Sequence, residues 1–340
     1  MPGFKDILGH DSIKEHLKKA AQTGMVSHAY ILNGEVGMGR KSLARAFALA
    51  LLCQEDTGEG CMVCHGCKQV LSDNHPDLIF VTHEKPSSIG VDDIRKQIYD
   101  TIWIKPYSSS YKIYIVDEAE KMTVQAQNAL LKTIEEPPSY AVLLLLTTSQ
   151  EAFLPTILSR CIQLKLKPLR DEMVRDYLLE KGQTDKSDAE IYVAFARGNL
   201  GRAVSIANSE DFRVMNEEIL KMLKNIHHMD ISEILDFIRM LKEDKVDIEE
   251  CLDFIQMWYR DVLLYKVTKD KKLLIFKNEC NSISEISDHS SYDGLEMILD
   301  SIGKTRRRLH SNVNMELIME LMLLSMKDSG INKNFSEKGV

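Results

Sequence analysis

Short apolar runs and helical patterns alternate along the first half of the chain. The apolar runs predict strands at 29–33, 78–82, 112–117, 141–148 and 161–166. Continuous apolar strands separated by helices are typical of a parallel sheet that helices cover on both faces. The fold class expected for this half of the chain is therefore α/β.

Between those strands, apolar residues recur with helical spacing. This spacing predicts helices at 11–23, 40–53, 91–102 and 123–136, and a short helical turn at 154–159. The helix at 123–136 has clear limits, because Met122 or Thr123 stands near its cap and Pro137-Pro138 stops it.

The second half of the chain is helical throughout. Pro168 marks a break, and no convincing strand pattern follows it. Longer amphipathic patterns occupy 211–328, and the polar tail at 331–340 is expected to fray. Before them, a small helical unit is predicted from patterns at 170–182, 187–197 and 200–208.

Length and charge exclude several classes of protein. A chain of 340 residues suggests two or three domains. No apolar run is long enough to span a membrane and no secretory signal is visible, so the cytoplasm is the expected location. The net charge of −8 implies that any contact with DNA is local or shared with other chains.

The stretch GEVGMGRKS at 34–42 is close to a phosphate-binding loop. Such a loop turns from a strand into a helix, and its Lys and its hydroxyl hold the phosphates and Mg²⁺. Arg40 and Lys41 stand where Lys and Ser or Thr are needed, and Ser42 comes one residue late. A plain glycine-rich turn, an inactive former nucleotide site and an active ATPase all remain open at this point.

An acidic pair, Asp117-Glu118, ends the apolar strand KIYIV. In a phosphate-loop enzyme, the Asp at this place helps to hold Mg²⁺ and the Glu polarises the attacking water. Two acids leaving a strand for solvent are the commoner case. The pair disagrees with the loop, because the hydrolytic acids are intact while the phosphate-binding side chains are not.

Four of the seven cysteines fall within 15 residues. Cys53, Cys61, Cys64 and Cys67 have the C-x₂-C spacing that lets thiolates share one tetrahedral ion. An iron–sulfur cluster is the competing interpretation, but the fourth Cys and the Pro that close such runs are missing. We therefore predict a structural Cys₄ zinc site, in which His65 takes no part.

Arg160 stands in LPTILSRC, near the end of the short helical turn. A cation at a helix C-terminus is the plain interpretation. The alternative is an arginine finger, which reaches a neighbouring subunit's γ-phosphate and stabilises charge in the transition state.

Taken together, these motifs resemble the bacterial clamp-loader subunits of DNA polymerase III, which are members of the AAA+ superfamily. The resemblance covers roughly residues 4–205, and its motifs are specific as a set. The matching pieces are FKDILGHDSI, HAYILNGEVGMGRKSLARAFA, the four cysteines, NHPDL, KIYIVDEAEKMTVQAQNALLKTIEEPP and LLLLTTSQEAFLPTILSRC.

The resemblance implies an architecture as well as a fold. An AAA+ nucleotide-binding-like domain at 1–167 would hold the zinc module at 53–67. A small helical lid at 168–209 and an all-α collar at 210–330 would follow, then a flexible tail. The collar would assemble with gamma or tau and delta subunits into a hetero-pentamer.

Departures from the family pattern distinguish the type of subunit. The gamma and tau motors carry Lys and Thr where Arg40 and Lys41 stand, and an Arg in the lid that senses nucleotide. In this chain that place holds Gly201, with Arg202 one residue late. With these two departures in one site, the chain resembles the delta-prime subunits. The degenerate site would comprise Gly34, Gly37, Gly39, Arg40, Lys41, Ser42, Asp117 and Glu118.

The resemblance also implies a mechanism. The subunit would help to load the sliding clamp onto primer–template DNA with little or no ATP hydrolysis of its own, and Arg160 would act in trans on a motor's ATP. Whether ATP still binds stays open. The rival functions are an ATP-hydrolysing gamma- or tau-like motor and a stand-alone zinc protein that binds nucleic acid. The acidic charge argues against the latter.

Overall fold

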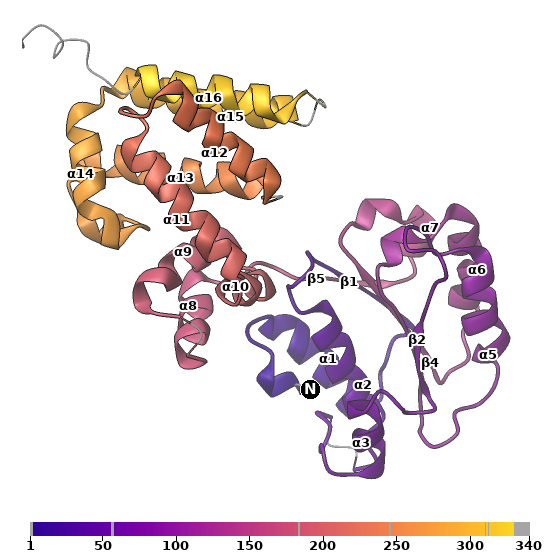
Figure 1. Cartoon of the computed structure of the whole chain (residues 1–340). Helices are drawn as coiled ribbons and strands as arrows, with labels where there is room; N and C mark the ends of the chain where they lie inside the picture. Colours follow the sequence, from indigo (N-terminus) through magenta and orange to yellow (C-terminus); the bar gives the residue numbers. More distant parts are fainter. Residues whose placement is uncertain are drawn as a thin grey trace, which may run out of the picture. The chain divides into compact units, whose positions relative to one another are not determined.

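The computed structural model describes residues 3–55, 58–182, 184–244, 246–309, 311 and 313–329. Contacts within this part of the chain define two compact units (Figure 1). The first unit contains the described residues up to Val174 together with Arg197–Arg202, and the second contains Arg175–Ala196 and the described residues from Ala203 onward. The lid as a separate domain, with boundaries at 167 and 209, stays a prediction, and the tail lies outside the described residues.

A five-stranded parallel sheet forms the centre of the first unit, as predicted. Its order is β2-β3-β4-β1-β5, so β1 and β4 are neighbours although far apart in sequence. Asn33 at the end of β1 lies opposite Thr147 at the end of β4. The loops that follow β1, β3 and β4 therefore leave one edge of the sheet, where ligands bind in open α/β folds. The strands are β1 (Ala29–Asn33), β2 (Leu78–Val81), β3 (Lys112–Val116), β4 (Ala141–Thr147) and β5 (Ile162–Lys165).

Helices cover both faces of this sheet (Figure 1). Because successive strand residues point to opposite faces, Tyr30 and Leu32 pack with the helices of one side. Ala29 and Ile31 pack with those of the other side. Helices α1 (Asp11–Thr23), α2 (Arg40–Leu51) and α3 (His65–Leu71) lie with the first set. The second set comprises α4 (Val91–Ile94), α5 (Asp100–Ile102), α6 (Val124–Glu135) and α7 (Pro155–Leu158).

Two local features of the first unit differ from the expectation. The segment predicted as one helix at 91–102 is interrupted by a π-helical turn, Arg95–Tyr99. Helix α3 was not predicted at all.

Thr123 is the cap of α6, since its hydroxyl accepts a hydrogen bond of 3.2 Å from Ala126 N. The short 3₁₀ turns of this unit are η1 (Phe4–Asp6), η3 (Ala119–Lys121) and η4 (Gln150–Ala152).

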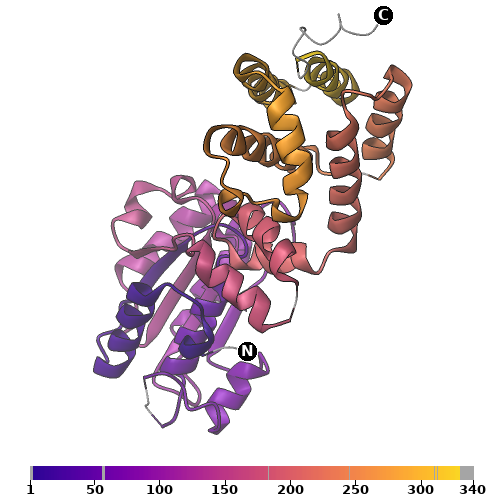
Figure 2. The same cartoon turned by 90° about the vertical axis from the view of Figure 1, so that its left-hand side faces the viewer.

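The second unit is all helical among its described residues (Figure 2). An aromatic core joins its helices: the ring centroids of Phe195 and Phe212 lie 5.0 Å apart, and those of Phe254 and Phe276 also 5.0 Å. Trp258 in the same cluster is fully buried. The helices from the end of the sheet onward are α8 (Asp171–Glu180), α9 (Lys186–Ala196), α10 (Leu200–Ala207), α11 (Glu210–Asn225), α12 (Ile231–Glu243), α13 (Ile248–Thr268), α14 (Cys280–His289), α15 (Tyr292–Leu309) and α16 (Met315–Ser329). Short 3₁₀ turns are η5 (Lys271–Leu273) and η6 (Lys277–Glu279).

None of the described helices has the length and apolar character that crossing a membrane requires.

Candidate nucleotide-like site and metal centre

The glycine-rich loop has the backbone of a phosphate-binding loop. It leaves β1 at Gly34, whose N–H donates to Thr147 O at 3.0 Å, and it enters α2 directly. Gly37 and Gly39 have φ values of +91° and +97°, which residues other than glycine rarely adopt. Gly39 is the N-cap of α2. The first turn of the helix therefore presents its N–H groups at the end of the sheet.

The side chains of this loop differ from those that hold magnesium nucleotide in a working phosphate-binding loop. Arg40 is only 7% exposed, and its Nη1 atom has no hydrogen-bond partner among the described residues. Lys41 is exposed and its Nζ lies 2.6 Å from Asp117 Oδ2. The ammonium of Lys41 is therefore paired with the carboxylate that would face Mg²⁺ in a working site. Ser42 lies within the first turn of α2, so its hydroxyl is turned about 100° from the place of the missing one.

The second acid is also held by a lysine of its own chain. Glu118 has a left-handed backbone, with φ of 49°, and its Oε2 lies 2.7 Å from Lys121 Nζ. His83 Nε2 approaches the same oxygen at 3.7 Å. Both sequence-predicted acids therefore lie after β3 beside the loop, and both are paired with lysine. The structure brings all eight predicted residues of this site to one edge of the sheet.

A further contact on the loop comes from the segment Arg197–Arg202. Asn199 is buried, its Nδ2 donates to Val36 O at 2.8 Å, and its Oδ1 accepts from Arg202 N at 3.1 Å. Gly201 N donates to Gly37 O at 3.0 Å. A Cβ atom at Gly201 would lie 2.5 Å from Gly37 Cα, so only glycine allows this approach. The sequence singled out Gly201 for a missing arginine but gave no signal for Asn199.

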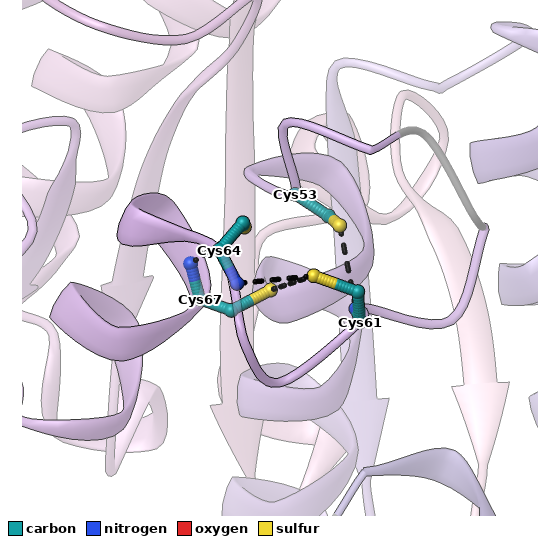
Figure 3. A group of neighbouring side chains, drawn as sticks. All are labelled: Cys53, Cys61, Cys64 and Cys67. Carbon is teal, nitrogen blue, oxygen red and sulfur yellow. Dashed lines mark hydrogen bonds between the residues drawn. The ribbon is translucent and has the colours of Figure 1, made fainter.

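The four cysteines form one group that could hold a metal ion (Figure 3). Their sulfurs all lie within 4.8 Å of one another. Cys61 Sγ and Cys67 Sγ are 3.9 Å apart, close to the roughly 3.8 Å that tetrahedral Zn–S bonds of about 2.3 Å require. Exposed His65 does not belong to the group. The donor set therefore fits a tetrahedral thiolate site.

The backbone around the cysteines favours thiolate sulfur. The amides of Cys61, Cys64 and Cys67 each donate to the sulfur of the preceding cysteine of the group at 3.3 Å. Burial raises the pKa of Cys53, but the amides of Cys61 and Glu55 outweigh it and bring the pKa to about 6. Burial raises the pKa of Cys67. A bound cation would deprotonate all four thiols.

The segment that carries the four cysteines is tied to the main core. Cys53 follows α2, Cys64 is the N-cap of α3, and Cys67 lies within α3. The loop approaches α2 closely, since a Cβ atom at Gly66 would lie 2.5 Å from Leu52 O. Cys67 and Val70 of α3 are buried in the same core as α2, so packing holds this helix of seven residues although they carry no strong helical pattern.

Arg160 lies just beyond α7 and is paired within its own chain. Its Nη2 is 3.0 Å from Glu135 Oε1, and its Nη1 donates to Thr156 O at 3.0 Å. The side chain is 39% exposed. Helix α7, which precedes it, packs on the face of the sheet opposite to the cysteines. It makes no contact with the loop at 34–42 in the described part of the chain, so it is not part of this chain's own nucleotide-like site.

Two family models match most of the chain. The model described as DNA polymerase III, delta subunit, matches residues 9–170, and the model of the C-terminal part of that subunit matches residues 216–328. The chain belongs to the DNA polymerase III delta-subunit family. The assignment agrees with the parallel sheet and the helical second unit.

The relatives of this chain include delta-prime and tau subunits of DNA polymerase III. The chain is 29% identical to the delta-prime subunit of Bacillus subtilis, over 92% of this chain and 94% of the relative. It is 27% identical to the tau subunit of the same organism over 95% of this chain, and it spans 61% of that subunit's length. A gamma subunit-related protein of Thermotoga maritima has 21% identity and a TM-score of 0.44, covering 93% of this chain and 99% of that one. The chain is a delta-prime homologue, with gamma and tau also similar.

Proposed function

We propose that this protein is a clamp-loader subunit that does not hydrolyse ATP and that helps to load a sliding clamp onto primed DNA. The observation that carries the proposal is the pairing of Lys41 with Asp117 at 2.6 Å, inside a loop that lacks the phosphate-binding Lys. Adding Mg²⁺ and nucleotide would require that ion pair to open. Arg40 does not replace the missing lysine, because its guanidinium is a bulky planar cation and not a compact ammonium.

The protein would contribute to hydrolysis in trans. Arg160 projects from the rigid junction of α7 and the sheet, and it is partly exposed. An arginine at the edge of a subunit can stabilise the charge that develops on a neighbour's γ-phosphate. In this proposal Arg160 acts on the ATP of an adjoining gamma or tau subunit, while this chain's own loop stays inactive.

The complex would supply the remaining partners. Gamma or tau and delta subunits would pack with the helical second unit, and the sliding clamp and the primer–template junction would be held by several subunits together. The net charge of −8 supports shared rather than solitary DNA binding. In this proposal, clamp loading takes place in the cytoplasm, with the chromosome.

Zinc would fill the Cys₄ group as a structural ion. Four thiolates close the tetrahedron and leave no position for substrate, so the ion would hold α3 and the loop before it against the core. No step of clamp loading would pass through the metal.

Isolated protein is expected to show no ATP turnover above that of Glu118→Gln. The reason is that Lys41 and Lys121 already pair with the two acids that hydrolysis needs. Steady-state phosphate release with Mg²⁺-ATP measures this. Glu120→Gln provides a control for a charge change in the same turn. Robust hydrolysis in the wild type that Glu118→Gln abolishes would instead make the chain a motor.

Purified protein is expected to contain about one zinc ion per chain, because the four sulfurs fit a single tetrahedral ion. Elemental analysis measures the content. Changing all four cysteines of the group to Ser should remove the metal and loosen residues 58–71 locally, while far-UV circular dichroism keeps most of its signal. Cys251→Ser, in the second unit, is the control. Iron in the wild type, or well-ordered protein without metal, contradicts the prediction.

A further inference from the structure

Glu135 holds the guanidinium of Arg160 in one orientation. Its Oε1 lies 3.0 Å from Arg160 Nη2. On the other side of the guanidinium, Nη1 donates to Thr156 O at 3.0 Å and to Ser159 Oγ at 3.3 Å. Three acceptors, from the end of α6, from α7 and from its C-cap residue, thus orient a side chain that is 39% exposed.

The carboxylate comes from a rigid frame. Glu135 is the last residue of α6, and α6 is joined to the segment before α7 by the buried side chain of Gln127. Gln127 Nε2 donates to Ala152 O at 2.8 Å, and its Oε1 accepts from Leu154 N at 2.8 Å. These two bonds link α6, which ends at Glu135, to the segment that enters α7, which Arg160 follows.

The contacts on Arg160 leave donors available. An arginine carries more N–H groups than the three contacts use, so the remaining ones can meet a phosphate while the ion pair persists. An unrestrained arginine side chain loses up to about 2 kcal/mol of rotamer entropy when it is ordered. An exposed ion pair contributes only about 0.2–1 kcal/mol to stability, so Glu135 matters more for orientation than for folding.

We propose that Glu135 is a positioning residue for Arg160, one that orders the guanidinium before a neighbour's nucleotide arrives. The proposal rests on the trans-acting role of Arg160 proposed above. Glu135 does not touch the phosphate. It acts by reducing the number of conformations that Arg160 must lose in the transition state, so its removal should lower the rate of hydrolysis and leave ATP affinity unchanged.

The test uses the reconstituted clamp-loader complex with this chain as the only altered subunit. The variants are Glu135→Ala, Glu135→Gln, Arg160→Ala and the double variant Glu135→Ala/Arg160→Ala. Glu136→Ala is the matched control, because Glu136 is the adjacent exposed acid and its carboxylate makes no hydrogen bond or ion pair in the described chain. The readouts are the kcat and KM of DNA-stimulated ATP hydrolysis and the rate of clamp loading.

Glu135→Ala is expected to slow clamp loading about threefold, with the kcat of ATP hydrolysis lowered and its KM unchanged. Without Glu135, the side chain of Arg160 is no longer ordered beforehand, so its conformational entropy must be lost in the transition state. Glu135→Gln keeps an oxygen acceptor and should retain most of the rate. Glu136→Ala should behave as wild type. In the Arg160→Ala background, Glu135→Ala should have no further effect.

Each other outcome has a distinct meaning. If Arg160→Ala impairs loading and Glu135→Ala does not, the positioning role is wrong and the arginine finger stands. If Glu135→Ala speeds hydrolysis, the carboxylate restrains Arg160 and the proposal is overturned. If Glu135→Ala slows loading equally with and without Arg160, it acts elsewhere and the proposal fails. If Arg160→Ala itself has no effect, the trans-acting role fails, and the positioning role fails with it.

Discussion

Replacing Arg160 with Ala should slow clamp loading steeply while the subunit folds and assembles normally. The side chain is partly exposed and its ion pair with Glu135 contributes little to stability, so folding should not depend on it. An arginine finger is worth about 10³–10⁵ in rate at the ATP site that it faces. Only that one site should fail, so ATP hydrolysis by the whole complex should fall only in part.

The measurement is the loading rate of the reconstituted complex, with assembly checked by size-exclusion chromatography. Arg160→Lys should not restore the rate, because an ammonium lacks the planar fork that makes paired contacts to phosphate. Arg170→Ala removes a similar exposed charge and is the control. Wild-type loading with Arg160→Ala would mean that Arg160 is only a cation at a helix end.

Replacing Asp77 with Ala should strongly destabilise the first unit. Asp77 is fully buried, and its carboxylate accepts hydrogen bonds from Tyr107 N at 2.6 Å and from Ser108 N at 2.9 Å. The hydroxyl of Ser109 donates to it at 2.9 Å. Alanine would leave these donors without an acceptor, a loss of about 3 kcal/mol or more. The midpoint of urea unfolding should fall clearly, whereas exposed Asp176→Ala should leave it unchanged.

The contribution of Asp77 should depend on pH with a defined sign. Burial raises the pKa of Asp77, but the hydrogen bonds from Tyr107, Ser108 and Ser109 outweigh it and hold the pKa below its usual value. A carboxyl with a lowered folded-state pKa stabilises the fold above its unfolded pKa, and this stability is lost as the pH falls through the folded-state value. The difference in the free energy of unfolding between wild type and Asp77→Asn should therefore become smaller toward acidic pH. A constant difference would assign the effect to packing alone.

Local patterns were sufficient for most of the secondary structure. Strand β1 and helix α1 have the limits that their apolar spacing predicts, because burial of one face or stripe is enforced residue by residue. Thr123 caps α6 as expected, since capping involves only neighbouring residues. Helix α3 and the π-helical turn at Arg95–Tyr99 were missed, because packing against the core decides them rather than propensity.

The sequence alone identified the class of protein and predicted which residues would form its sites. The spacing of the four cysteines predicted a metal-binding group, and the structure brings their sulfurs within 4.8 Å. Arg40 and Lys41 marked the loop as degenerate before any fold was known. Such features are readable because each lies within a short stretch of chain.

Only the tertiary structure decided which side chains meet across the fold. Lys41 pairs with Asp117 because β1 and β3 deliver their loops to one edge of a parallel sheet. Glu135 at the end of α6 meets Arg160 beyond α7 because these two helices pack on the same face of the sheet. Asn199 reaches the glycine-rich loop from more than 160 residues away. Local periodicity determines which face of an element is buried, but it does not encode which charged partner will be found there, because that depends on how distant elements pack.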